Sequence, residues 1–142
     1  TQIVSAAQNM TFTLGRARVT FIGPARTQHT DSRDDGLTLR IDYGQTSVVV
    51  TGCITSNGEK EIVSSGAAAA CDALIVSRGG TEAATCAEWV EAAKPKVALI
   101  TGKNPANSVR IRLQKYGATV YAAKENGVMT LFSDGQEITV EP

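Results

Sequence analysis

The hydrophobic pattern changes twice along this chain. Near the amino terminus, apolar and polar residues alternate in short paired segments, which predicts antiparallel β-hairpins with one buried side. In the middle, short unbroken aliphatic runs are typical of strands buried on both faces, as in parallel sheets. Short alternating segments return near the carboxyl terminus. The strands that we expect are 11–14, 17–22, 37–41, 47–51, 73–76, 97–100, 119–122, 128–132 and 137–140.

Three segments between and after the central strands carry helical patterns. Residues 59–70 are rich in good helix formers. Residues 81–93 place apolar residues at three- and four-residue spacing, and either Thr81 or Thr85 is suited to cap this helix. The third segment, 105–117, opens on a proline, a residue favoured in the first turn of helices.

This order of elements predicts a single domain, residues 1–142, with an α/β (α+β) fold. Strand–helix–strand units need parallel pairing with right-handed crossovers, whereas the hairpins at both ends imply antiparallel strands. We therefore expect a mixed β-sheet with helices on one face. Turns at Asn126–Gly127 and Asp134–Gly135 predict that the last three strands form a meander. Residues 1–10 have a weak pattern and are expected to fray or to pair at a sheet edge.

The charge balance gives no support for nucleic acid as a partner, although a local basic patch remains an alternative. The 142 residues carry 14 Lys+Arg and 14 Asp+Glu, so there is no overall basic field for nucleic acid or an anionic membrane. The basic residues Arg110, Arg112 and Lys115 fit a solvated helix face better than a nucleic-acid patch. No run approaches the ~20 apolar residues of a membrane span. The first ten residues lack the basic start and apolar centre of a signal peptide.

The three cysteines, Cys53, Cys71 and Cys86, form an odd set without CxxC spacing. A disulfide framework is therefore not expected, although one pair remains an alternative. We favour free thiols, because cysteine often packs simply as a small buried residue.

Several fixed points follow one another along the chain and point to a family. They are L-T-L-R-I-D-Y-G, V-V-V-T-G, D-A-L-I-V followed by G-G-T, A-A-K-P-K-V-A-L-I, Q-K-Y-G-A-T-V-Y and E-N-G-V-M-T-L-F-S-D-G. In this order they resemble the carboxyl-terminal half of the metallo-β-lactamase-fold domain of ComEC/Rec2-type competence proteins. The resemblance runs from about Thr11 to Val140.

The resemblance implies that this chain is half of an αββα sandwich made of two similar halves. It also implies a two-metal site at the sheet ends, which hydrolyses phosphodiesters such as DNA. The family's H-x-H-x-D-H motif belongs to the amino-terminal half, which this chain lacks. Positions that carry metal ligands in the family's carboxyl-terminal half correspond here to Cys53, Arg78, Gly79 and Asn104.

The residues themselves also argue against the two-metal chemistry. Such a site needs several carboxylate and imidazole ligands, and the only histidine is His29, in the polar segment 25–36. Near it, Asp31, Asp34 and Asp35 suggest a metal cluster, but a flexible polar loop is the interpretation we favour. An arginine at position 78 puts a fixed positive charge where a cation would lie. We therefore predict no catalytic residues and no cofactor, with Zn or Mn only if a partner supplies ligands.

Other chemistry remains open at the same loops. Arg78, Gly80, Lys103 and Asn104 are candidates for an anion pocket, because backbone N–H groups at helix starts favour negative charge. The alternative is that these are ordinary solvated loop residues. Cys53 is either a reactive or metal-binding thiol or, as we favour, a small residue in place of a lost aspartate.

The central strands are apolar on both sides, as Val48 and Val50 on one side and Val49 on the other illustrate. A lone half of a sandwich would leave one such side in water, which soluble monomers rarely do. We therefore expect a homo-oligomer, or a missing amino-terminal half, to cover the exposed sheet face.

The function we favour is that of a non-catalytic relic of a ComEC-like domain, acting as a structural or interaction module. The implied setting is DNA uptake (competence) or another envelope-associated system, and extracytoplasmic and cytoplasmic locations both stay open. One alternative is half of a metal-dependent phosphodiesterase or nuclease that a partner chain completes. A second alternative is a small anion-binding module.

Overall fold

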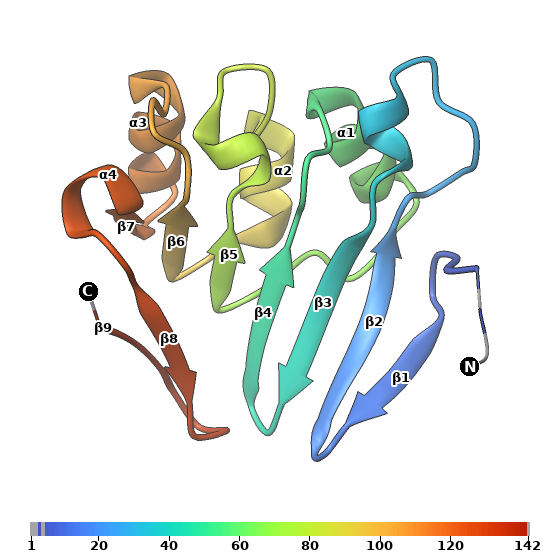
Figure 1. Ribbon diagram of the computed structural model, residues 1–142, viewed down its shortest axis with the longest axis horizontal. Coiled ribbons are helices and arrows are strands. Elements are labelled where there is room, and N and C mark those ends of the chain that lie inside the picture. The colour runs from blue at the N-terminus through green and yellow to red at the C-terminus, as the bar shows by residue number, and fades with distance from the viewer. Residues whose placement is uncertain (1–2, 4, 142) are drawn as a thin grey trace.

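The computed structural model describes residue 3 and residues 5–141, and within them the chain has a mixed α/β fold. These residues form a seven-stranded sheet, a separate two-stranded sheet and four α-helices (Figure 1). No helix of this part of the chain is long and apolar enough to cross a membrane. In chain order the elements are β1 (Thr11–Leu14), β2 (Ala17–Gly23), the 3-10 helix η1 (Ser32–Asp35), β3 (Thr38–Tyr43), β4 (Thr46–Val50), α1 (Ser56–Ser64), β5 (Ala73–Ile75), the 3-10 helix η2 (Ser77–Gly80), α2 (Ala87–Ala93), β6 (Val97–Ile100), α3 (Asn107–Lys115), β7 (Thr119–Ala122), α4 (Ala123–Asn126), β8 (Thr130–Ser133) and β9 (Ile138–Glu141).

The large sheet is antiparallel in its first half and parallel in its second. Strands β1 to β4 pair as two successive hairpins, and β4 to β7 pair in parallel. The strand order follows the chain, so α1, α2 and α3 each link two neighbouring parallel strands. The predicted mixed sheet is confirmed.

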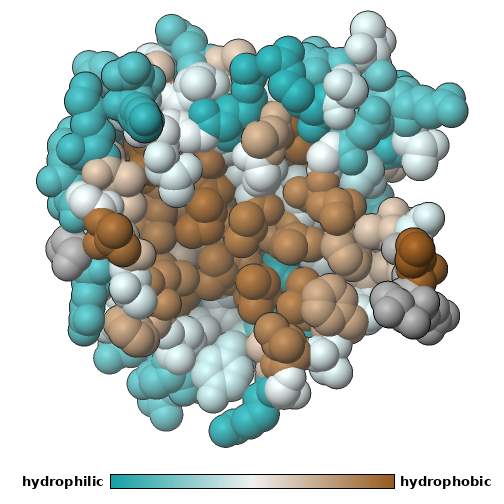
Figure 2. Space-filling view, in the orientation of Figure 1, coloured by the Kyte–Doolittle hydropathy of each residue, from teal (hydrophilic) through white to brown (hydrophobic). Residues whose placement is uncertain are grey.

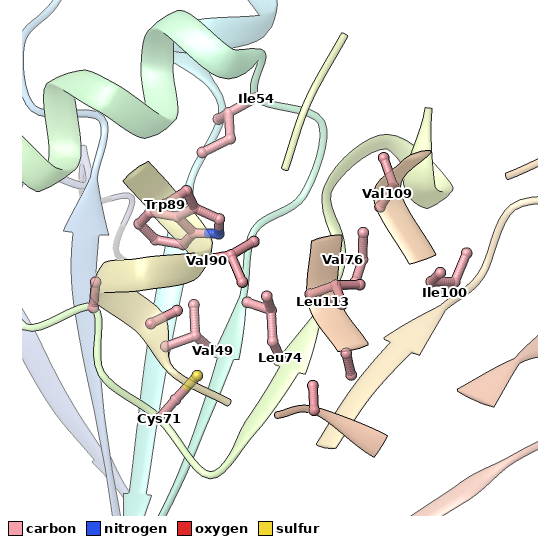
Figure 3. Packing of buried hydrophobic residues seen from close by; sticks show 14 of the residues in the cluster. Val49, Ile54, Cys71, Leu74, Val76, Trp89, Val90, Ile100, Val109 and Leu113 are labelled. Carbon is pink, nitrogen blue, oxygen red and sulfur yellow. The ribbon is translucent and has the colours of Figure 1, made fainter. Parts of the chain in front are cut away.

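The helices α1, α2 and α3 lie on one face of the sheet, and the core lies between the two layers (Figure 1). Register brings Val49, Leu74 and Ala98 side by side on that face, and all three are fully buried. They pack with Trp89 and Val90 of α2, as Figure 3 shows for the labelled side chains. The apolar helix face predicted within 81–93 is therefore the one that is buried.

Two helices begin elsewhere than the sequence predicts, and one of them also ends elsewhere. Helix α1 spans Ser56–Ser64 instead of 59–70, and Thr55 is its cap, whose side chain accepts the N–H of Asn57. Helix α2 begins at Ala87 instead of position 81, so the proposed threonine caps are wrong. Thr85 has a φ of 59°, which no helix accommodates.

The predicted closing meander is wrong, because β7 joins the large sheet. It pairs in parallel with β6, and the short helix α4 occupies the place of the predicted turn at Asn126–Gly127. Strands β8 and β9 form a hairpin of their own around Asp134–Gly135, as that turn predicted. The hairpin docks on the start of β4, where the Gln45 N–H donates to the Gly135 carbonyl at 2.6 Å.

The expectation that residues 1–10 fray or pair at a sheet edge falls partly on residues 1, 2 and 4, which lie outside the described residues. At the end of this segment, the Asn9 N–H donates to the carbonyl of Phe21, and the Phe21 N–H donates to the carbonyl of Met10. The segment thus extends the pairing along β2.

Candidate functional site

The face of the large sheet that points away from the helices is apolar, and we call it the open face. Cross-strand register groups its side chains into two rows, because residues directly opposite one another point to the same side. Figure 2 shows a broad hydrophobic surface over these strands, ringed by polar residues. The rows are Phe21, Leu39, Val50, Ile75, Leu99 and Tyr121, and Phe12, Val19, Ile41, Val48, Ala73, Val97 and Thr119.

Burial differs sharply between the two sides of the same strand. Val49 is 0% exposed beneath the helices, whereas its neighbours Val48 and Val50 on the open face are only half-buried. At the sheet edge, Phe12 is 48% exposed and contacts Phe21 with a ring-centroid separation of 5.9 Å. The sequence therefore has the pattern of a sheet covered on both sides, and one side of it faces solvent in the isolated chain.

The hairpin β8–β9 covers one end of the open face. The Thr46 and Ser133 hydroxyls are 2.6 Å apart, and a Cβ added at Gly135 would lie 3.3 Å from the Tyr43 ring. Within the rows Ala73 and Leu99 are buried, while Val48, Val50 and Ile75 stay half-buried, so the hairpin forms a border of the surface.

The loops at the carboxyl ends of the parallel strands meet at one edge of the sheet. The Arg78 N–H donates to the Gly52 carbonyl at 3.0 Å, which joins the loop of Cys53 to η2. A Cβ at Gly79 would lie 2.6 Å from the Gly102 Cα, so the loops after β5 and β6 touch. Arg78 and Gly79 both have positive φ, 50° and 61°, which suits this tight backbone packing.

The residues in these loops differ in accessibility. The Cys53 thiol is exposed, while Gly80 is buried against Ile100 and its carbonyl accepts the Ala106 N–H at 2.8 Å. Cys71 and Cys86 are also free thiols, and burial raises the pKa of both to about 12. A thiol with such a pKa is protonated at neutral pH and is a poor nucleophile or metal ligand.

Lys103 lines a cavity of about 310 Å³, but its basic neighbour there is Lys124 rather than Arg78. Thr101, Gly102 and Ala123 complete the lining, and Asn104 lies outside it. Among the described residues, neither lysine forms an ion pair. Sequence reasoning missed Lys124, since it assigned that residue to a hairpin connection.

The predicted polar loop is fastened to α1 through a charged cluster. His29 has a side chain only 3% exposed, with Nδ1 at 2.8 Å from Asp35 and Nε2 at 2.7 Å from Glu61. Arg26 also holds Glu61 through two hydrogen bonds. The hydrogen bond that the His29 ring donates to the Asp35 carboxylate is the main cause that raises the pKa of His29, and Glu61 contributes further.

Within residues 3 and 5–141, no three His, Cys, Asp or Glu side chains lie together as a set suited to hold a metal ion. His29 is already bonded to carboxylates at both ring nitrogens. Asp31 is held by Arg33, whose hydrogen bond lowers the pKa of that carboxyl to about 2. The cavity of about 670 Å³ beside these residues is thus lined by charged groups that already have partners, either within the lining or, for Lys60, at Glu88.

Two carboxylates are buried, and both serve the backbone. Asp34 accepts hydrogen bonds from the N–H and the hydroxyl of Thr55, at 2.7 and 2.9 Å, just before α1. Glu59 is 0% exposed and accepts the N–H groups of Thr85 and Cys86, at 2.6 and 2.8 Å, just before α2. Desolvation raises the pKa of Glu59 to about 7. These carboxylates fix where the two helices begin.

Comparison with models of known protein families and with curated proteins finds no match to this chain.

Proposed function

We propose that this chain is a non-catalytic structural or interaction module that uses the open face of its sheet to pack against a second β-sheet. We further propose that it is a relic of the carboxyl-terminal half of a ComEC-like metallo-β-lactamase-fold domain. In that ancestry the second sheet is the other half of an αββα sandwich. A role in DNA uptake or an envelope-associated assembly follows from the same ancestry and belongs to this proposal.

The observation that carries the proposal is the apolar open face. Large exposed apolar surfaces on soluble proteins mark interaction sites, and two sheets that pack face to face form a standard core. The edge where the ancestral metals would bind supports the non-catalytic part of the proposal. It offers Cys53, Arg78 and Asn104 in place of carboxylates and imidazoles, which makes a poor ligand set for two divalent ions.

Metal analysis and a nuclease assay of the purified assembly test the non-catalytic role. We expect no stoichiometric Zn or Mn, and no phosphodiesterase activity above that of a protein-free blank with either metal added. Two tightly bound metal ions per assembly, together with DNA cleavage abolished by a chelator, would refute the proposal. That outcome would instead support a nuclease completed by ligands from a partner chain.

A second candidate function, anion binding, is favoured by the cavity that Lys103 and Lys124 share. It lies at the carboxyl ends of β6 and β7, where open α/β sheets bind ligands. Inorganic phosphate titrated into ¹⁵N-labelled protein should shift the amide signals of Gly102 and Lys103. Lys103→Gln and Lys124→Gln should each weaken binding about tenfold, a typical loss for one charged contact, and Lys115→Gln on α3 is the matched control. Equal effects of all three substitutions would indicate nonspecific binding.

A further inference from the structure

We propose that a second copy of this chain occupies the open face, forming a symmetric dimer in which the two sheets pack face to face and the helices lie outside. The inference rests on the proposed interaction role and names the partner for that same surface. It would build four layers, αββα, from two identical chains.

The accessible surface is the first reason. The chain exposes 7934 Å² for a mass of 14.9 kDa. A compact monomer of this mass exposes about 7000 Å². The excess is about 900 Å², and a standard interface buries about 800 Å² on each partner. The excess accessible surface of the chain is therefore similar to the area that one partner buries in a stable dimer.

The chemistry of the open face is the second reason. Its two rows contain aliphatic and aromatic side chains, one threonine (Thr119) and no charged group. A copy of the same face can therefore cover it without burying an unpaired charge. The formal net charge of the chain is zero, so two copies do not repel each other strongly. The cation Arg16 is not a member of either row, and its guanidinium carbon lies 5.7 Å from the Tyr43 ring centroid.

Symmetry makes such a surface self-complementary. In a twofold dimer the same patch serves on both subunits, and two twisted sheets pack about 10 Å apart with their strands roughly aligned. The β8–β9 hairpin borders the face near Tyr43 and Thr46, and the exposed strand β1 borders it at Phe12. The paired central rows would lie between these borders.

Sedimentation equilibrium of the wild-type chain between about 1 and 100 µM tests the dimer. The predicted result is a species of about 30 kDa, twice the 14.9 kDa of one chain, that dissociates only on dilution. A single species of about 15 kDa at every concentration would overturn the inference.

Matched variants locate the contact. Leu39→Lys puts a charge in the middle of the open face, twice per dimer, and should raise the dissociation constant at least about 100-fold. Ile111→Lys makes the same kind of change at a 56% exposed position on α3 and should leave the dimer intact. If circular dichroism shows that Leu39→Lys does not fold, Phe12→Lys at the exposed edge of the same face replaces it in the test of the dimer contact. A dimer lost in Ile111→Lys but kept in the open-face variants would contradict the proposed surface.

The sedimentation result and the metal analysis can each contradict one proposal without contradicting the other. A monomer without bound metal refutes the second copy but leaves a non-catalytic module whose partner is another chain, such as a separate amino-terminal half. Two bound metal ions with chelator-sensitive DNA cleavage refute the non-catalytic role, even in a dimer.

Discussion

At the scale of single residues, Glu59 is a carboxylate whose pKa is raised strongly by burial. Its carboxylate lies wholly buried between α1 and α2 and accepts the two N–H groups that precede α2. The same contact explains why the helix starts at Ala87, six residues later than the pattern of the sequence predicts. The carboxylate that binds these N–H groups lies 26 residues earlier in the chain, so the sequence around position 87 does not indicate where the helix begins.

The raised pKa of Glu59 predicts how stability changes with pH. Its folded pKa of about 7 exceeds the value of 4.5 expected in the unfolded chain, so the folded state binds the proton more tightly. The resulting stabilisation is fully present below pH 4.5 and is lost as the pH rises through 7. Between pH 5 and pH 8, this group alone should lower the free energy of unfolding by about 2–3 kcal/mol.

Urea denaturation of the wild type and Glu59→Gln at pH 5 and pH 8 checks this prediction. The glutamine cannot ionise. The decrease in the free energy of unfolding from pH 5 to pH 8 should therefore be smaller in the variant than in the wild type by about 2–3 kcal/mol. Glu88→Gln, at an exposed position on α2, is the control and should keep the wild-type difference. An unchanged pH dependence in Glu59→Gln would show that Glu59 does not titrate in this range.

His29 supplies a second prediction at the residue scale. It is the only histidine, so its ring protons titrate without overlap in an NMR spectrum. Its pKa should lie above the ordinary 6.5, because Asp35 and Glu61 bind the imidazolium. Its stabilising effect is then present below pH 6.5 and is lost as the pH rises through the folded pKa. Glu61→Gln should lower the pKa of His29, and no change would contradict the hydrogen bond seen at Nε2.

The sequence predicts which loops lie together at the edge of the sheet, but it does not predict which side chains meet there. The carboxyl ends of parallel strands must share an edge, so the loops of Cys53, Arg78 and Lys103 could be expected to lie together, and they do. No pattern indicates that His29 bonds to Glu61 or that Lys103 and Lys124 line one cavity. Each of these pairs lies more than 20 positions apart in the sequence and is brought together by tertiary packing.

At the scale of elements, the docking of the β8–β9 hairpin depends on two glycines. Gly44 has a φ of 59°, and a Cβ there would lie 2.2 Å from the Gly135 carbonyl oxygen. Any side chain at position 44 must therefore push the hairpin away from β4. The contact also carries the short hydrogen bond from Gln45 to Gly135.

Gly44→Ala should destabilise the fold by about 2–4 kcal/mol, from the clash in addition to the strain of a positive φ. Gly15→Ala is a matched control, since Gly15 has a φ of 60° with nothing within 4 Å of the added Cβ, and it should cost only about 1 kcal/mol. Thermal unfolding measures both. Equal losses in the two variants would mean that the hairpin contact at Gly44 does not form.

The elements also show where local turn signals are overridden. Asp134–Gly135 makes the predicted hairpin, because its two flanking strands have only each other to pair with. Asn126–Gly127 does not, because β7 finds a better partner in β6 and buries Ala122. Pairing within a large sheet outweighs the preference of a two-residue turn.

At the scale of the whole molecule, the pattern of apolar strands predicted the architecture. Alternating segments became the antiparallel half of the sheet, and unbroken aliphatic runs became its parallel half. The same runs predicted cover on both sides. The helices provide one cover, and the proposed second copy provides the other.

In the proposed dimer, the second copy buries the open face of the sheet. The most direct measurement is the NMR relaxation of isoleucine δ1 methyl groups caused by a soluble paramagnetic probe, at about 100 µM protein. We expect Ile41 and Ile75 on the open face to be protected almost as well as the buried Ile62, while Ile111 on α3 relaxes strongly. If Ile41 and Ile75 relax as strongly as Ile111, the open face is bare in solution and no second sheet covers it.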